Sequence, residues 1–350
     1  IVLGSLGAAI GSVTGGDSQF LTPDLVTSIA AADDANDTIL GGEGADRIIG
    51  GGNDDTAGDP TVETLAGESG TDIILGDHGE AVLVNGLLTR IATIDHALGG
   101  SDTVHGGAGN DLIAGGAGSD LLHGGNGIAG ATVAGTDFDI ILGDNGEFAG
   151  IEDQATQRIT RVETTDTSAG TGGNDRIEGN EDDDIILGGV GDDMIDGNAG
   201  DDLILGDSGR FDSRAAGENS SPRYRVLTGS TIYGDGLNGG TDGEALVDSA
   251  SEYDRPGGAE RWANFEVTPD DGSGVPHGGD SIAGGAGDDT LLGQGGNDTV
   301  QGDGSIALSV SAGRNPDGTL VVSPSSEDFA GAGSDGDDYI EGNAGDDLIF

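Results

Sequence analysis

A nine-residue period is the feature that most constrains what this chain folds into. Each unit carries aspartate at position six and an aliphatic residue at position eight, and most units begin with glycine. The period is clearest in residues 179–187, 188–196 and 197–205, and it recurs at 106–114, 115–123, 284–292, 293–301 and 342–350. A short repeat that stays in phase predicts a solenoid, in which every unit packs mainly against its neighbours.

Aspartate occupies position six in sixteen units, and each time Ile, Leu or Val follows two residues later. A carboxylate that returns in phase at a turn is a candidate metal ligand. These candidates are Asp37, Asp46, Asp72, Asp102, Asp111, Asp120, Asp139, Asp175, Asp184, Asp193, Asp202, Asp280, Asp289, Asp298, Asp338 and Asp347.

The two halves of each unit predict different local structures. Positions seven to nine predict a strand of about three residues whose central aliphatic side chain points inward, so that stacked units form a thin core. The glycine-rich half predicts a turn, because glycine reaches positive φ without steric cost and leaves its carbonyls open to a ligand. The turn glycines expected at metal sites are Gly106, Gly109, Gly179, Gly188, Gly191, Gly197, Gly200, Gly284, Gly287 and Gly293.

The charge of the chain indicates that a cation belongs to the fold. Its formal net charge is -53, with 65 acidic residues against 12 arginines and no lysine, which argues against nucleic-acid binding. With 34% apolar and 3% aromatic residues the composition lies close to that of disordered acidic chains, which is the alternative interpretation. The strict period of the apolar positions favours a fold in which cations neutralise the acidic residues.

The available donors favour calcium among the metals. The chain has no cysteine, and calcium takes six to eight oxygens from carboxylates and backbone carbonyls, which an Asp-terminated glycine turn supplies. Magnesium prefers a smaller, water-rich octahedral shell, and zinc prefers histidine or cysteine. The histidines show no ligand spacing and are expected at the surface; they are His78, His96, His105, His123 and His277.

The repeat resembles the calcium-binding nonapeptide G-G-x-G-x-D-x-U-x of the RTX (repeats-in-toxin) family. The resemblance implies an all-β, right-handed parallel β-roll that folds on binding several Ca2+ ions, with two nonapeptides in each coil. Turns eighteen residues apart then stack and hold an ion, which pairs Asp102 with Asp120, Asp175 with Asp193, Asp184 with Asp202, and Asp280 with Asp298. Outside the long runs, Asp37, Asp72 and Asp139 are expected to lack such a partner nearby in the sequence. The family also implies secretion, commonly by a bacterial type I apparatus, and an extracellular location.

A larger period overlies the nonapeptides. The motif I-L-G-D-x-G occurs at 74–79, 141–146 and 204–209, and alternating β-branched stretches follow at 88–95 and 159–166. These stretches predict strands or hairpins inserted between blocks of roll. The expected units are residues 1–76, 77–143, 144–206, 207–302 and 303–350.

The longest departure from repetition, residues 209–276, holds six arginines and the single tryptophan, Trp262. It is interpreted as a small local core or as a contact surface.

No stretch is apolar enough to span a membrane. Both ends of the chain fall at repeat junctions, which favours a window cut from a longer repetitive protein, or a unit that stacks end to end with other copies.

No catalytic motif survives inspection, so the chain is not expected to be an enzyme. Residues 206–209 (G-D-S-G) resemble the nucleophile motif of serine proteases, but the equivalents of Ser208 are His78 and Asn145. The expected function is structural: calcium folds an acidic coil into a rigid rod of a fibre, adhesin stalk or surface layer. The rival is a calcium-dependent folding and secretion module of a larger enzyme or toxin. Binding of sugar or ice through the roll would need a regular array of outward Thr or aromatic residues, which is missing.

Overall fold

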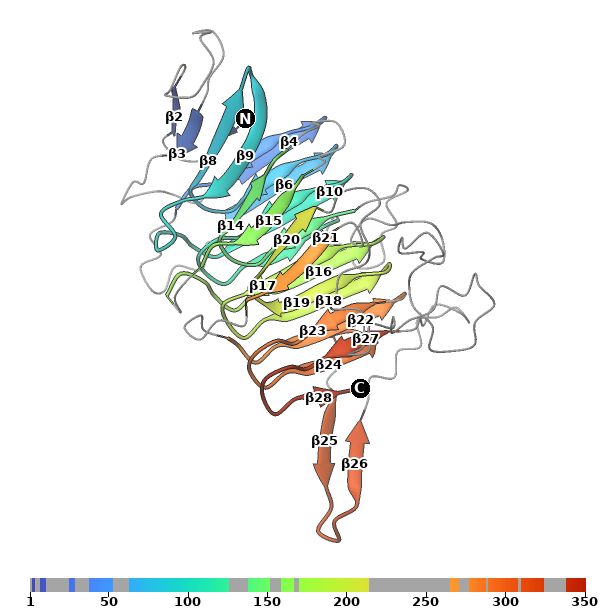
Figure 1. Ribbon diagram of the computed structural model, residues 1–350. Helices are drawn as coiled ribbons and strands as arrows, with labels where there is room; N and C mark the ends of the chain where they lie inside the picture. The colour runs from blue at the N-terminus through green and yellow to red at the C-terminus, as the bar shows by residue number, and fades with distance from the viewer. Residues whose placement is uncertain are drawn as a thin grey trace.

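The computed structural model describes residues 2–3, 7–10, 25–28, 38–52, 63–125, 138–151, 159–166, 170–213, 265–270, 277–287, 289–307, 310–323 and 338–350. These residues form only strands and turns, and none of their elements is a helix that could cross a membrane. The fold is a parallel β-roll, seen in Figure 1 as strands stacked from the blue end of the chain to the red end.

The roll consists of two nine-stranded parallel sheets between which the chain alternates. The sheet that we call the middle sheet contains β1 (Val2–Leu3), β5 (Arg47–Ile49), β7 (Ile73–Leu75), β11 (Leu112–Ala114), β13 (Ile140–Leu142), β17 (Ile185–Gly189), β19 (Leu203–Asp207), β23 (Thr290–Leu292) and β27 (Tyr339–Glu341). The sheet that we call the outer sheet contains β4 (Thr38–Glu43), β6 (Glu63–Ser69), β10 (Asp102–Ala108), β12 (Leu121–His123), β16 (Arg176–Glu181), β18 (Met194–Ala199), β22 (Ser281–Ala286), β24 (Thr299–Asp303) and β28 (Leu348–Ile349).

The core between these two sheets consists of the position-eight residues, as the period predicts. Strands pair in register, so that Ile186 of β17 lies beside Ile204 of β19, and Ile177 of β16 beside Ile195 of β18. All four side chains have no exposed surface. The full cluster is Ile39, Ile48, Leu65, Ile74, Val104, Ile113, Leu122, Ile141, Ile177, Ile186, Ile195, Ile204, Ile282, Leu291 and Val300.

The β-branched insertions form a third layer, an eight-stranded antiparallel sheet that we call the hairpin sheet. Each hairpin leaves the roll after a middle-sheet strand and pairs with the hairpins before and after it. The hairpin sheet contains β2 (Gly7–Ile10), β3 (Leu25–Ser28), β8 (Gly79–Val84), β9 (Leu87–Thr93), β14 (Gly146–Ala149), β15 (Arg161–Thr164), β20 (Gly209–Ser213) and β21 (Phe265–Pro269).

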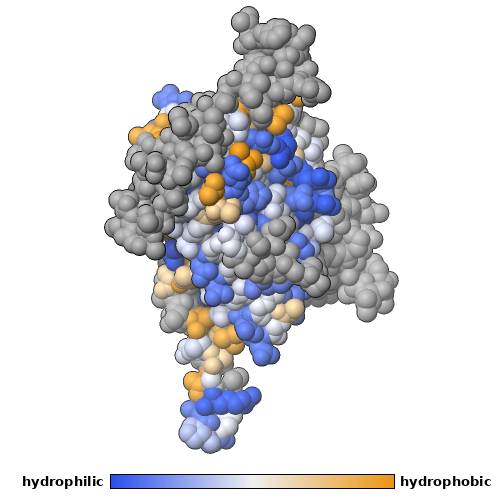
Figure 2. Space-filling model, turned by 90° about the vertical axis from the view of Figure 1, so that its left-hand side faces the viewer, coloured by the Kyte–Doolittle hydropathy of each residue, from blue (hydrophilic) through white to orange (hydrophobic). Residues whose placement is uncertain are grey.

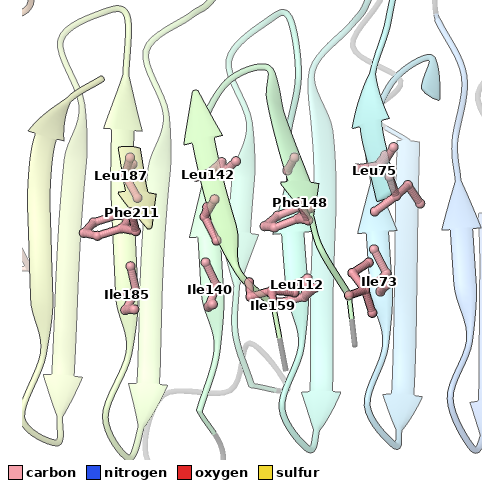
Figure 3. Packing of buried hydrophobic residues seen from close by; sticks show 14 of the residues in the cluster. Ile73, Leu75, Leu112, Ile140, Leu142, Phe148, Ile159, Ile185, Leu187 and Phe211 are labelled. Atoms are coloured by element: carbon pink, nitrogen blue, oxygen red, sulfur yellow. The ribbon is translucent and has the colours of Figure 1, made fainter. Parts of the chain in front are cut away.

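The hairpin sheet lies on the outside of the middle sheet and creates a second core, which the sequence analysis did not anticipate. Figure 3 shows Phe148 and Phe211 packed among the leucines and isoleucines of positions seven and nine, such as Leu142, Ile185 and Leu187. Several middle-sheet strands are therefore apolar at three consecutive positions, as expected of strands buried on both faces. Outer-sheet strands are reliably apolar only at the central position, because their other face is turned away from both cores.

Ion pairs link the strands of the hairpin sheet on its other face. Arg90 contacts Glu80 and Glu147, and Arg161 lies 2.8 Å from Asp212. In the view of Figure 2 the described surface is largely hydrophilic, with hydrophobic side chains in small patches. A separate, exposed hairpin, β25 (Ser311–Arg314) and β26 (Leu320–Ser323), projects beyond the last coil in Figure 1.

The structure tests the expectations for the hairpin stretches, for the long insertion and for the histidines. The stretches 88–95 and 159–166 contribute to hairpin strands, as predicted. Of the long insertion, residues 214–264 and 271–276, including Trp262, lie outside the described residues, and the described part ends in β20 and β21. The five-unit division stays a prediction. The expectation of surface histidines was wrong: His78 and His123 are buried, and the other three are only partly exposed.

Candidate metal sites

The position-six aspartates form two ladders, one along each edge of the roll. In each ladder the backbone amide of one aspartate donates to Oδ1 of the aspartate one coil further on, at 2.7–3.2 Å. The first edge, where the chain passes from the outer to the middle sheet, carries Asp46, Asp72, Asp111, Asp139, Asp184, Asp202, Asp289 and Asp338. The second edge carries Asp102, Asp120, Asp175, Asp193, Asp280, Asp298 and Asp347.

The four pairings implied at eighteen-residue spacing are present as ladder neighbours, at 2.8–3.0 Å. Asp72 and Asp139 have no ladder partner eighteen residues away, but each has a ladder partner from a distant segment of the chain. Asp72 bonds to Asp111, 39 residues on, and Asp139 to Asp184, 45 residues on. The insertions leave the roll and the chain returns to the same edge, so stacking does not depend on sequence distance. Asp37 lies outside the described residues.

The second carboxylate oxygen, Oδ2, of the ladder aspartates lies beside a turn glycine, close to a backbone carbonyl oxygen of the next coil. We call this arrangement of Oδ2, glycine and carbonyl oxygen a cradle. A Cβ placed on Gly188 would lie 2.6 Å from Asp193 Oδ2 and 2.1 Å from the Gly206 carbonyl oxygen. The corresponding point at Gly197 lies 2.1 Å from Asp202 Oδ2 and 2.5 Å from the carbonyl of Gly284. Carboxylate and carbonyl oxygens thus converge where glycine leaves space, and two acceptors facing one point need a donor or a cation between them.

The protein itself supplies no hydrogen-bond donor to many of these buried Oδ2 atoms. Oδ2 makes no hydrogen bond in Asp120, Asp175, Asp184, Asp193, Asp202, Asp280 and Asp298, whose residues are at most 3% exposed. A buried acceptor without a partner costs roughly 1–3 kcal/mol, and more when it is charged. The oxygen-only donor set fits Ca2+, and these residues would hold it.

Burial raises the pKa of several ladder aspartates. Desolvation, the largest cause, raises the pKa of Asp120 and Asp193 to about 7 and that of Asp280 to about 10. The pKa values of Asp175, Asp184 and Asp202 also lie well above the ordinary value, mainly because of burial and further because nearby carboxylates repel one another. In the absence of a cation, these buried carboxylates favour their protonated form.

The turn glycines of the sequence prediction lie in two different environments. The glycine at position one of the nonapeptide lies in the cradle, against Oδ2 of the aspartate at position six. This is the case at Gly106, Gly179, Gly188, Gly197, Gly284 and Gly293. Position four has positive φ and lies against the preceding turn, as at Gly109, Gly191, Gly200 and Gly287. A Cβ on Gly200 would lie 2.1 Å from the Asp182 carbonyl oxygen, so this position is glycine for close backbone approach.

The aspartate of the I-L-G-D-x-G motif fastens the start of three hairpins to the roll, a role that the sequence analysis missed. Asp207 accepts hydrogen bonds from the Gly278 amide at 3.0 Å and the Gly295 amide at 2.8 Å, on two successive turns. Asp77 does the same with Gly100 and Ala117. The recurrence of this motif at the start of the β8–β9, β14–β15 and β20–β21 hairpins was the available signal. We call Asp77, Asp144 and Asp207 the staple aspartates.

The last glycine of the same motif lets the hairpin begin directly over the roll. A Cβ on Gly146 would lie 2.1 Å from Leu142 Cδ1, and one on Gly79 would lie 2.3 Å from Leu75 Cδ1. The residue between aspartate and glycine is buried, and Ser208 is 1% exposed. The resemblance of 206–209 to a protease motif therefore follows from hairpin packing, and the Ser208 hydroxyl is closed to a substrate in this structure.

Comparison with known protein families agrees with the geometry. The model of the RTX calcium-binding nonapeptide repeat matches residues 30–57, 96–128, 163–195, 179–210, 278–305 and 332–350. No curated protein matches the chain. The matched segments contain most ladder aspartates and the turns that precede them. The matched segments are therefore calcium-binding nonapeptide repeats of the RTX type.

Proposed function

We propose that this chain is a secreted structural rod, folded by extracellular calcium, within a fibre, an adhesin stalk or a surface layer. The observation that carries the proposal is the convergence of carboxylate and carbonyl oxygens at the turn cradles, repeated along both edges of the roll. A cation at each cradle would satisfy the buried oxygens and lower the repulsion of a chain with net charge -53.

Calcium would act as a folding switch under this proposal. The ladder aspartates come together only in the folded roll, so calcium binds the folded state and stabilises it in proportion to RT ln(1 + [Ca2+]/Kd) at each site. A cytoplasm low in calcium would leave the acidic chain unfolded and competent for export. Outside the cell, the stacked coils and the hairpin sheet would then form together.

The experiment is a calcium titration of the purified chain from chelator to about 10 mM, followed by far-UV circular dichroism and electron microscopy. We expect a calcium-dependent β signal together with filaments. A β signal with only separate rods would favour the second candidate, a calcium-dependent module of a larger secreted enzyme or toxin. An unfolded chain at saturating calcium would contradict both.

A matched variant separates calcium binding from bulk charge screening. Asp184→Asn and Asp202→Asn together remove two adjacent ladder carboxylates, whereas Asp317→Asn with Asp346→Asn removes the same charge from exposed positions. We expect only the ladder pair to raise the calcium concentration at the folding midpoint. Equal shifts in both variants would show that calcium acts only by screening.

A further inference from the structure

Two histidines and a glutamate form a row on the outer sheet that lies outside the calcium cradles. His105 of β10 is in register with His123 of β12, and His123 is in register with Glu178 of β16. Their side chains leave the sheet on the face turned away from the roll core, since Val104, Leu122 and Ile177 occupy the inward positions. The histidines are eighteen residues apart in sequence, the length of one coil.

The two imidazole rings stack directly on each other. Their centroids are 5.0 Å apart and their planes differ by 7°. Nδ1 of His105 and Nδ1 of His123 are both buried without a hydrogen bond. His123 Nδ1 lies 3.4 Å from Glu178 Oε2, without the geometry of a hydrogen bond. Arg176 donates to Glu178 Oε1 at 2.6 Å, which leaves Oε2 facing the histidine.

We propose that His105, His123 and Glu178 bind a divalent transition-metal ion such as Zn2+, Ni2+ or Cu2+. Two imidazole nitrogens and one carboxylate oxygen are the donor set that these ions prefer, whereas calcium prefers oxygen alone. Metal ligands on neighbouring strands of the outer sheet keep their spacing because the roll fixes the register. The site is thus chemically distinct from the cradles along the two edges.

Binding requires a small movement of the side chains. No three acidic or histidine side chains of the described chain converge on a metal-sized point as they stand. Neighbouring strands are about 4.8 Å apart, and an ion with metal–nitrogen bonds of about 2.0–2.1 Å draws two nitrogens to within roughly 3.5 Å. Rotation of each ring about χ2 would tilt the stacked pair so that two nitrogens converge on one ion at the outer side of the row, where the Glu178 carboxylate, on the other side of His123, would also reach it.

The test is calorimetric titration of the full chain with ZnCl2 and, separately, NiCl2, in buffer with enough calcium to keep the roll folded. We expect one ion per chain with micromolar affinity, weakened at least tenfold by His105→Gln and by His123→Gln. His96→Gln, which removes a histidine from another part of the molecule, should leave the affinity unchanged. Circular dichroism of each variant checks that the roll is folded.

A spectroscopic measurement on the unaltered chain keeps the test decisive if a variant misfolds. Bound Cu2+ should show hyperfine splitting from two equivalent nitrogens by electron paramagnetic resonance. Purely oxygen ligation, or equal zinc affinity in the chain and in His105→Gln, would overturn the proposal, and the rings would then be a packing pair. Either result leaves the calcium-dependent fold untouched, because that fold is measured without transition metals.

Discussion

The amide nitrogen of Asp184 donates to Oδ1 of Asp202, 2.8 Å away, although eighteen residues separate them in the chain. The bond leaves Oδ2 of both residues free of hydrogen bonds and buried beside glycine carbonyls. One side chain thus does two things: Oδ1 sets the distance between coils, and Oδ2 contributes to a cation cradle. Substitutions that separate these roles are the most informative.

Asp202→Asn should retain much of the shape and one acceptor while removing the charge on the cradle. We expect the calcium midpoint of folding to rise about three- to tenfold, because affinity at oxygen sites depends on the number of charged ligands. Calcium titration by circular dichroism measures the shift. Asp317→Asn, on the exposed hairpin, is the control, and an unchanged midpoint in Asp202→Asn would remove this residue from the ligand set.

Gly200→Ala should destabilise the calcium-loaded roll by more than about 2 kcal/mol, because its φ is +144° and the new Cβ would lie 2.1 Å from a carbonyl oxygen. Gly313→Ala, where a Cβ meets nothing within 4 Å, is the matched control. Denaturant unfolding at saturating calcium gives both values. Similar stabilities for the two variants would contradict the close approach of turns.

Asp207→Ala should loosen the β20–β21 hairpin from the roll without abolishing calcium binding. It removes the acceptor of the Gly278 and Gly295 amides, and each buried amide left without a partner costs roughly 1–3 kcal/mol. Hydrogen exchange should accelerate at these two amides, while the amide of Asp184 on the first edge stays protected. Uniform acceleration along the chain would mean that the staple supports the whole roll instead.

Low pH should promote folding of the calcium-free chain in part, because protonation removes the charge of the buried aspartates as calcium would neutralise it. The pKa of Asp193 is raised to about 7 and that of Asp280 to about 10 in the folded roll, above the ordinary value of 3.8, so the folded state takes up protons. Ionisation therefore opposes folding: without calcium, the stability contributed by these groups is full below about pH 4 and is lost as the pH rises through the folded values.

Calcium-stripped chain should accordingly gain β signal when the pH falls from 8 to about 5, as measured by circular dichroism without a chelator. Calcium-saturated chain is the control and should change little over that range, because its carboxylates stay ionised. A calcium-stripped chain that is equally unfolded at both pH values would contradict the burial of the ladder aspartates.

The sequence was sufficient to predict the roll, but not the packing of the hairpin sheet on the middle sheet. Aspartate at position six and an aliphatic residue at position eight predict both the ladders and the roll core, because these positions repeat in phase. The fit of Phe148 and Phe211 onto the middle sheet depends on contacts between segments that share no repeat frame. Apolar residues at three consecutive positions, as in Ile140–Leu142, were the available sign that these strands are buried on both faces.

The stacking of ladder residues followed from sequence only where the spacing is eighteen. Asp193 and Asp280 are ladder neighbours 87 residues apart, a distance set by an insertion of irregular length. The histidine row was missed although its spacing was visible in the sequence: His105 and His123 are eighteen residues apart, the interval that pairs Asp102 with Asp120, and the roll turns that interval into direct contact.

The ladder bonds also bear on how far the loops of such a chain can vary in length. Neighbouring rungs are separated by anything from 18 to 87 residues, yet the amide-to-carboxylate distance stays within 2.7–3.2 Å. Lengthening a loop by a few residues therefore costs little, since closure entropy grows only with the logarithm of loop length. Loops on such a frame can therefore differ widely in length while the pitch of the coils stays the same.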